Sequence, residues 1–238
     1  VQTIWRLLDY VAVDYPGAVS GGSVISPAEY AEMTEFAAQI EARLKRLPQK
    51  TAKPNLVARA ATLRQSIAAK SAPATIEEQS RGLAEALLGS YPVPLAPRST
   101  PDLARGAKLY AENCSMCHGA TGAGNGPGAA RLDPPPIAFT NAARARERSL
   151  FALYQVISQG LEGTSMASFE ALPDGDRWAL SFYVGSLAFP ESSQSSGRQI
   201  WDRDAPVRAA IPDLATLVAK TPAQLAREFG DGKAGPLT

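Results

Sequence analysis

The stretch Cys114-Ser115-Met116-Cys117-His118 decides how the rest of the chain is interpreted, because it holds every cysteine and the only histidine among 238 residues. Two cysteines separated by two residues and followed directly by histidine form the attachment pattern of a c-type haem. The two thiols add across the vinyl groups on one edge of the porphyrin, and the adjacent histidine is then held beneath the iron as its proximal ligand. The pattern predicts one covalently attached haem c, bound through Cys114 and Cys117 and ligated by His118.

Two other interpretations of the cysteine pair are a disulfide and a zinc site. A Cys-x-x-Cys disulfide is typical of a redox fold, and no such pattern surrounds this pair. A structural zinc site takes four ligands drawn mainly from Cys and His. The chain offers three such residues, so a fourth ligand would have to be a carboxylate. We therefore favour haem c.

Composition argues against several classes of partner and location. The formal net charge is +1 and 45% of residues are hydrophobic, so nothing indicates binding to nucleic acid or to an anionic membrane. No stretch approaches the roughly 18 consecutive apolar residues that span a bilayer. No signal-peptide pattern follows Val1. Because haem c is attached outside the bacterial cytoplasm, we expect a periplasmic protein whose targeting segment is absent from this sequence.

Residues 1–91 show the apolar spacing of four amphipathic helices joined by short connections, which predicts an antiparallel bundle. The first helix is expected near Thr3–Val13 and should stop before Pro16, because the residue preceding a proline avoids the helical region. The apolar residues at helical spacing that we expect to face the bundle core are Ile4, Leu7, Leu8, Val11, Met33, Phe36, Ile40, Leu44, Leu47, Leu56, Ala60, Leu63, Ile67, Ile76, Leu83 and Leu87.

Start signals place the other three helices of this region. Ser26 reads as an N-cap, with Pro27 at the first helical position and Glu29 completing a capping box. A third helix is expected after Pro54. A second capping box, Thr75–Glu78, is expected to open the fourth helix.

A stiff proline-rich connector, residues 92–98, is the predicted boundary to a second domain at residues 99–190. A helix that begins at Thr100–Asp102 and runs to about Asn113 would deliver the cysteine motif. The glycine- and proline-rich segment Gly119–Pro136 has no periodicity, and we expect it to be ordered by wrapping a haem edge. Further helices are expected near Ser149–Gln159 and Asp174–Leu187.

Residues 191–238 form a predicted helical extension. It begins with a polar linker at Ser192–Gly197, and two short helical patterns follow near Leu214–Lys220 and Ala223–Phe229. Each pattern has too few apolar residues to fold alone, so both should pack on other elements. The sequence lacks an end signal, which suggests truncation before a membrane region. The complete prediction is an all-α chain: a four-helix bundle-like domain, a haem-binding domain and a short helical extension.

The second axial position of the haem iron separates electron transfer from catalysis. The chain has no other histidine, and its methionines are Met33, Met116 and Met166. Met116 lies inside the attachment loop and Met33 in the N-terminal region, which leaves Met166 as the predicted sixth ligand. A thioether ligand raises the reduction potential relative to bis-histidine haem. With both positions filled, the expected task is outer-sphere electron transfer, and the alternative is a haem enzyme or a gas or redox sensor with a displaceable Met166.

Residues 99–188 resemble a class I cytochrome c domain. The resemblance rests on the helix Gly106-Ala-Lys-Leu-Tyr110, the loop Gly163–Phe169, and a last helix carrying Trp178, Leu180 and Tyr183. It implies that the first and last helices cross closely. Gly106 lacks the side chain that would hold the two backbones apart, and the aromatic residues would fill the crossing.

The same resemblance implies a second contact for the proximal histidine. In this family a proline carbonyl accepts the hydrogen bond from the histidine ring and fixes its orientation. Pro127, Pro134 and Pro135 are all candidates. We favour the segment Leu132-Asp-Pro-Pro-Pro136 without choosing within it.

A narrower resemblance covers the whole chain. Leu8–Val19 (LDYVAVDYPGAV) followed by Val24–Met33 (VISPAEYAEM) is similar to the extracytoplasmic part of bacterial cytochrome c/iron-permease fusion proteins. The resemblance implies electron transfer in support of iron uptake, with a redox protein and a membrane iron permease as partners. This sequence departs from that family in lacking the permease's membrane helices and Arg-Glu-x-x-Glu motifs, so we do not expect these 238 residues to transport iron themselves.

Charged residues leave further alternatives open. Carboxylates of the N-terminal region would suit ferric iron, although capping and solvated-face roles explain them more simply; these residues are Asp9, Asp14, Glu29, Glu32 and Glu35. Arg144, Arg146 and Arg148 could dock an acidic redox partner, neutralise haem propionates or form a solvated helix face. One alternative function is therefore a docking module whose helical bundle binds iron or a partner protein.

Overall fold

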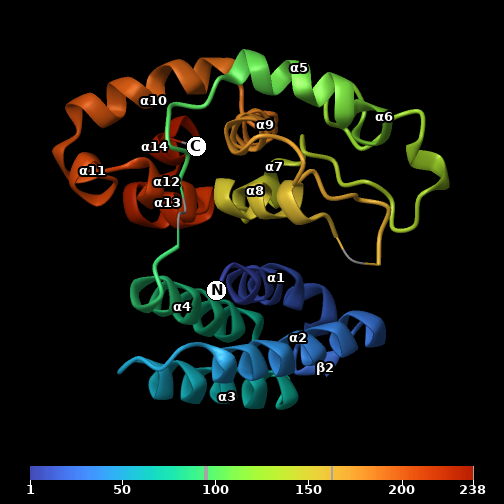
Figure 1. Ribbon diagram of the computed structural model, residues 1–238, viewed down its shortest axis with the longest axis vertical. Helices are drawn as coiled ribbons and strands as arrows, with labels where there is room; N and C mark the ends of the chain where they lie inside the picture. The colour runs from blue at the N-terminus through green and yellow to red at the C-terminus, as the bar shows by residue number, and fades with distance from the viewer. Residues whose placement is uncertain (94–95, 162, 238) are drawn as a thin grey trace. The chain divides into compact units, whose positions relative to one another are not determined.

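The computed structural model describes residues 1–93, 96–161 and 163–237, and it is built almost entirely from helices (Figure 1). The all-α prediction is confirmed. Contacts divide the chain into two compact units, residues 1–94 and residues 95–238. Pro94 and Leu95, which belong to the predicted connector, lie outside the described residues, as do Glu162 and Thr238.

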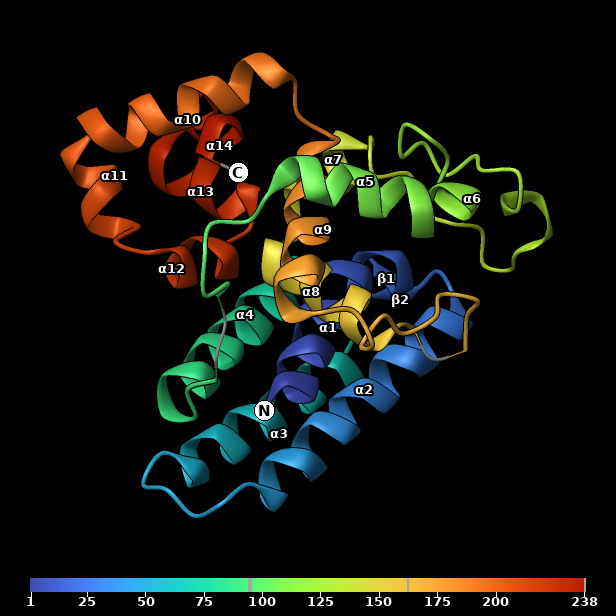
Figure 2. The same ribbon diagram turned by 45° about the horizontal axis from the view of Figure 1, so that its top comes forward.

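The first unit is a four-helix bundle. Its helices are α1 (Gln2–Ala18), α2 (Pro27–Arg46), α3 (Lys53–Ala68) and α4 (Pro73–Ser90). Helices α1 and α3 each pack against both α2 and α4, so the four close a ring (Figure 2). All the predicted core residues are buried except Phe36 and Leu47, which are half-buried.

Helix α1 is longer than predicted and contains Pro16 in its last turn. Tyr15, which precedes the proline, is fully buried, and its hydroxyl donates a hydrogen bond to the Ser71 carbonyl at 3.1 Å. This packing outweighs the local preference of a pre-proline residue for extended conformation. A two-stranded hairpin, β1 (Val19–Ser20) and β2 (Ser23–Val24), then leads into α2.

Neither of the two predicted capping boxes forms in full. The Ser26 hydroxyl accepts a bond from the Glu29 N–H at 3.4 Å, as predicted for an N-cap. The Ser26 N–H donates to the Ala18 carbonyl at 3.4 Å and not to the Glu29 side chain, so the second bond of the capping box is not formed. Helix α4 begins at Pro73, with Ala72 as its N-cap, and the predicted start at Thr75 is wrong. Proline at the first position of the helix supplies the start.

The second unit begins with the helices that surround the cysteine motif. They are α5 (Leu103–Asn113), α6 (Ser115–His118), α7 (Ala142–Arg146), α8 (Leu150–Gln159) and α9 (Asp174–Ser186), with a 3-10 turn at Ala129–Arg131. The Asp102 carboxylate caps α5 by accepting a bond from the Arg105 N–H at 3.0 Å. The boundaries of α5, α8 and α9 agree closely with the helices predicted from the sequence, whereas α6 and α7 were not predicted.

Helices α5 and α9 cross at Gly106. A Cβ atom there would lie 2.8 Å from Tyr183 Cβ and 2.8 Å from the carbonyl carbon of Ala179, with the Ala179 oxygen closer still. The rings of Tyr110 and Tyr183 pack at the crossing with centroids 5.4 Å apart. Trp178 does not join them, because it stacks on Tyr154 of α8 at 4.2 Å. The aromatic residues that pack at the crossing are therefore Tyr110 and Tyr183.

Five more helices form the C-terminal part of this unit. They are α10 (Glu191–Arg203), α11 (Ala205–Ala210), α12 (Leu214–Ala219), α13 (Pro222–Phe229) and α14 (Asp231–Leu237). The prediction of a polar linker at Ser192–Gly197 is wrong, because that stretch lies within α10. Gly197 is buried against α14, where a Cβ atom would lie 2.9 Å from the carbonyl carbon of Pro236.

The two short predicted helices, now α12 and α13, pack on other elements as expected. A small core joins Val207, Ile211, Leu225, Ala234 and Leu237 within this part of the unit. Helix α12 also contacts α8, and α13 contacts α7. Among the helices that the structure describes, none is both long and apolar enough to cross a bilayer.

Candidate functional site

The cysteine motif is one turn of helix. Cys114 ends α5, and its carbonyl accepts bonds from the N–H groups of Cys117 at 3.2 Å and His118 at 2.9 Å. Residues three and four positions apart lie on the same side of a helix. Both thiols are free and half-buried. The motif therefore presents two thiols and one imidazole together, and the disulfide interpretation finds no support.

The imidazole of His118 is held by its Nδ1 atom, which lies 3.1 Å from the carbonyl oxygen of Ile137. Burial lowers the pKa of His118, and the hydrogen bond to Ile137 opposes that shift. In the neutral ring Nδ1 donates its proton to this carbonyl, so the lone pair of Nε2 faces away and is available to a metal. The geometry matches that of a proximal haem ligand.

The predicted proline acceptor is wrong, since Ile137 follows the proline run. The carbonyl oxygen of Pro136 lies against Gly124, where a Cβ atom would approach it to 2.7 Å. The next carbonyl along the chain, that of Ile137, is the one that reaches the imidazole. Pro134 and Pro135 are exposed and Leu132 is half-buried, so any contact that they make with a haem stays a prediction.

The glycine-rich segment after His118 folds back over the motif. The N–H of Gly124 donates to the His118 carbonyl at 2.8 Å, and that of Gly126 donates to the Cys117 carbonyl at 3.1 Å. From α5, the buried Tyr110 hydroxyl donates to the Gly119 carbonyl at 2.7 Å. A segment without periodicity is thus ordered by main-chain bonds to the motif, which fixes the position of the imidazole.

Burial also governs the titration of the neighbouring groups. It raises the pKa of Tyr110 to about 12, with smaller contributions from Cys114 and Tyr183. It raises the pKa of the Cys114 thiol to about 11, and the nearby Cys117 adds to the shift. Both groups are therefore neutral at physiological pH, which suits an apolar cofactor crevice.

Met166 lies on a loop whose backbone is fixed at several points. The N–H of Leu161 donates to the Met166 carbonyl at 3.0 Å, and the Met166 N–H donates to the Thr164 hydroxyl at 3.1 Å. The loop is tied to the end of α8 by the Ser168 hydroxyl, which donates to the Ser158 carbonyl at 2.8 Å. The Met166 side chain is half-buried. Its ligation of iron stays a prediction.

These residues fit a c-type haem. The motif supplies two free thiols on the same helical turn as an imidazole whose Nδ1 is already hydrogen-bonded, and this unit also contains the fixed methionine loop. Across residues 1–93, 96–161 and 163–237, no three His, Cys, Asp or Glu side chains are grouped so that they could hold a metal ion.

The carboxylates of the bundle fall into two environments. Asp9 is buried and forms an ion pair with Arg81 at 3.7 Å. Glu32 is exposed, yet partial desolvation raises its pKa, and the negative charges of Glu29, Asp14 and Glu35 raise it further. Four acidic groups therefore share one end of the bundle.

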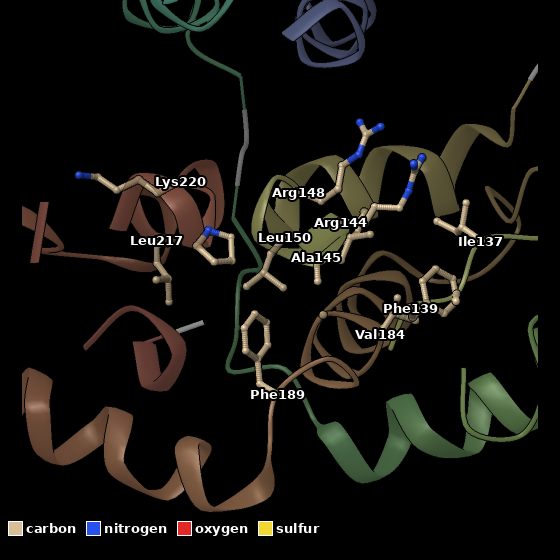
Figure 3. Close-up of a pocket in the computed structure, with 14 residues that line it drawn as sticks. Ile137, Phe139, Arg144, Ala145, Arg148, Leu150, Val184, Phe189, Leu217 and Lys220 are labelled. Atoms are coloured by element: carbon tan, nitrogen blue, oxygen red, sulfur yellow. The ribbon is translucent and has the colours of Figure 1, made fainter. Parts of the chain in front are cut away.

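The three arginines near α7 also differ from a simple solvated face. Arg146 forms an ion pair with Asp231 of α14, which links α7 to the C-terminal helices. Arg144 and Arg148 line an apolar cavity between helices α7–α9 and helices α12–α13 (Figure 3). Their charged ends point away from the apolar side chains that line this cavity, which include Phe139, Leu150, Val184, Phe189 and Leu217.

Two known families match parts of the chain, one in each unit. Residues 103–188 match the family described as Cytochrome c, and residues 1–93 match the family described as Iron permease-associated 4-helix bundle domain. Among solved structures, the Kuenenia stuttgartiensis reducing HAO-like protein complex Kustc0457/Kustc0458 is 31% identical over 48% of this chain, with a TM-score of 0.35. This chain covers 59% of that one. No curated protein matches the chain.

Proposed function

We propose that the chain is a periplasmic single-electron carrier that supports iron uptake. The proposal is supported by the match of residues 1–93 to an iron permease-associated four-helix bundle domain and of residues 103–188 to cytochrome c, the two parts of the fusion proteins that the sequence resembles. The electron-transfer part of this proposal rests on the arrangement of the two thiols and the imidazole in the motif Cys114–His118. Two free thiols lie on the same helical turn as an imidazole whose Nδ1 is bound to the Ile137 carbonyl.

The chain's own residues hold and orient the cofactor. A bound haem c supplies a one-electron iron couple. The thiols of Cys114 and Cys117 would form the thioether links that prevent its loss, and Nε2 of His118 would hold the iron while Nδ1 stays on the Ile137 carbonyl. That hydrogen bond raises the basicity of the ligand and fixes its tautomer.

Met166 completes the coordination in this proposal. Its loop is bonded at Leu161, Thr164 and Ser168, so the thioether would be offered from a backbone that is already ordered. A ligand on a fixed loop favours a closed iron site over one that opens to substrate. This supports electron transfer over the alternatives of a haem enzyme or a gas sensor.

The link to iron comes from the first unit. Its family is associated with iron permeases, so we propose that the bundle places the cytochrome domain beside such a permease, where a bound haem would supply the one-electron couple that changes the oxidation state of iron. One electron would pass to a ferric ion or from a ferrous ion, with no atom transferred. The redox partner that completes the cycle is a second protein.

The Met166 ligand is tested by the near-infrared charge-transfer band of a methionine bound to ferric haem. We expect the ferric haem-loaded protein to show the band and to keep it in dilute cyanide. Met166→Ala should abolish it. Met116→Ala is the matched control, because Met116 is 62% exposed, and it should leave the band unchanged. A band that persists in Met166→Ala would refute this ligand.

The exchange with iron is tested by stopped-flow mixing of the ferrous full-length protein with a ferric chelate. We expect reoxidation with one haem oxidised for each ferric ion reduced. Failure of the ferrous protein to react, together with failure of the ferric protein to be reduced by a ferrous chelate, would contradict a role in iron redox chemistry.

A further inference from the structure

We infer that Phe139 is a positioning residue for the proximal ligand, setting the rotation of the His118 imidazole about the direction of its iron bond. The inference rests on the proposed function, because it concerns the ring that would bind haem iron. Phe139 lies two residues after Ile137, whose carbonyl holds Nδ1 of the same imidazole.

The phenyl ring of Phe139 stacks on the imidazole of His118. Their centroids are 4.4 Å apart and their planes differ by 23°. The hydrogen bond to Ile137 fixes one atom of the imidazole, and by itself it leaves the ring free to rock about the line between Nδ1 and the carbonyl oxygen. A flat aromatic face against the imidazole removes that remaining rotation. The two contacts from one short segment therefore define both the position and the plane of the ring.

Phe139 is itself held from two sides. Its N–H donates to the Gly122 carbonyl at 2.7 Å, within the loop that folds over the motif. Its ring meets the edge of Tyr110 at a centroid distance of 6.4 Å and an interplanar angle of 70°. The Tyr110 hydroxyl binds the carbonyl of Gly119, the residue after His118. The contacts thus close a loop from His118 through Phe139 and Tyr110 back to the motif.

Packing contacts with its surroundings hold the Phe139 side chain. The residue is half-buried, packs against the core cluster formed by α5, α8 and α9, and lines the apolar cavity in Figure 3. Contacts with the core cluster and with the imidazole limit the rotation of the phenyl ring. The fold therefore sets the plane of the phenyl ring, and the stacked phenyl ring in turn sets the plane of the imidazole.

The plane of an axial imidazole has a direct spectroscopic signature. In ferric low-spin haem it contributes, together with the second axial ligand, to the in-plane magnetic axes of the iron. Rotation of the imidazole with the second ligand unchanged therefore alters how the four haem methyl resonances spread in the proton NMR spectrum. A role in general packing would lower stability and leave this pattern unchanged. The pattern therefore separates positioning from a structural contribution.

The experiment compares three variants of the haem-loaded, full-length protein. Phe139→Leu keeps an apolar side chain and loses the flat face, and we expect the haem methyl pattern to change. Phe139→Tyr keeps the ring and should restore the wild-type pattern. Phe182→Leu is the matched control: Phe182 is also half-buried in this unit, but its ring contact is with Trp178 at 6.4 Å. That variant should keep the wild-type pattern.

Each outcome is decisive. A wild-type methyl pattern in Phe139→Leu would overturn the inference, as would an equal change in Phe182→Leu. Absence of covalent haem from the wild-type protein would refute the proposed function, and this is established by mass before any variant is compared. A low-spin wild-type haem combined with an unchanged Phe139→Leu pattern would refute only the positioning role.

Discussion

The crossing of α5 and α9 allows one substitution to be worked out in detail. Gly106→Ala adds a single methyl group at a position where a Cβ atom would lie 2.8 Å from Tyr183 Cβ and from the carbonyl carbon of Ala179. These distances are well inside van der Waals contact. The obstructing atoms are backbone and Cβ atoms of α9, so no side-chain rotation relieves the clash. The two helices must move apart.

Two opposing effects set the size of the loss. Alanine is favoured over glycine in a helix by about 1 kcal/mol. Overpacking a well-packed core destabilises by roughly 1–3 kcal/mol, and anchored neighbours put this site at or above the upper end. The net loss is therefore about 2 kcal/mol or slightly more. For a unit of this size it corresponds to a fall in melting temperature of roughly 4–8 °C.

The assay is thermal unfolding of the haem-loaded protein, followed by the Soret absorption so that only the second unit is observed. Gly175→Ala is the matched control, because Gly175 lies on α9 and a Cβ atom added there would meet nothing within 4 Å. The control should be neutral or slightly stabilising. A Gly106→Ala protein that melts at or above the wild-type temperature would refute the close crossing.

Three further predictions concern stability. Tyr110→Phe removes the 2.7 Å bond to the Gly119 carbonyl and should lower the free energy of unfolding by about 1 kcal/mol, measured in urea; an unchanged midpoint would contradict it. The Arg105 guanidinium lowers the pKa of Asp176, so this pair stabilises the fold above a pH of about 4 and the stabilisation is lost as pH falls through the lowered pKa. Asp176→Asn should therefore destabilise at neutral pH and converge with wild type in acid, and a constant difference between pH 7 and pH 2 would count against the pair. Leu83→Ala, at a fully buried position of the bundle, should cost about 2–5 kcal/mol in the first unit while leaving the Soret transition in place, and a loss confined to the second unit would contradict the division into units.

Much of the helical architecture could be predicted because apolar spacing reports burial directly. Leu83 and Leu87 lie one turn apart on α4, and both are fully buried in the bundle. Asp102, predicted near a helix start, caps α5 through the Arg105 N–H. In each case the signal and the structural feature lie within one or two turns of each other.

The predictions that failed depend on contacts between distant parts of the sequence. Pro16 sits inside α1 because the buried Tyr15 binds the Ser71 carbonyl. Residues 192–197 are polar and contain a glycine, which favours a linker by composition. They are helical in a segment where Gly197 packs against Pro236 of α14. No local pattern records these partners.

The residues of the site also divide into those that a local pattern predicts and those whose roles depend on contacts between distant parts of the sequence. Cys114, Cys117 and His118 follow from spacing, because the chemistry requires them on one helical turn. Ile137 and Phe139 do not, because their roles depend on how the aperiodic segment after the motif folds back over it. A signal for Phe139 would have been an aromatic residue shortly after a proline run that is expected to face the histidine.

The most direct test of covalent haem attachment is the intact mass and absorption spectrum of the full chain, expressed with haem-maturation machinery and measured after denaturation. We expect a coloured protein heavier than the polypeptide by one haem, with the added mass lost when Cys114 and Cys117 are both replaced by serine. A colourless product with the mass of the bare polypeptide would contradict the central claim.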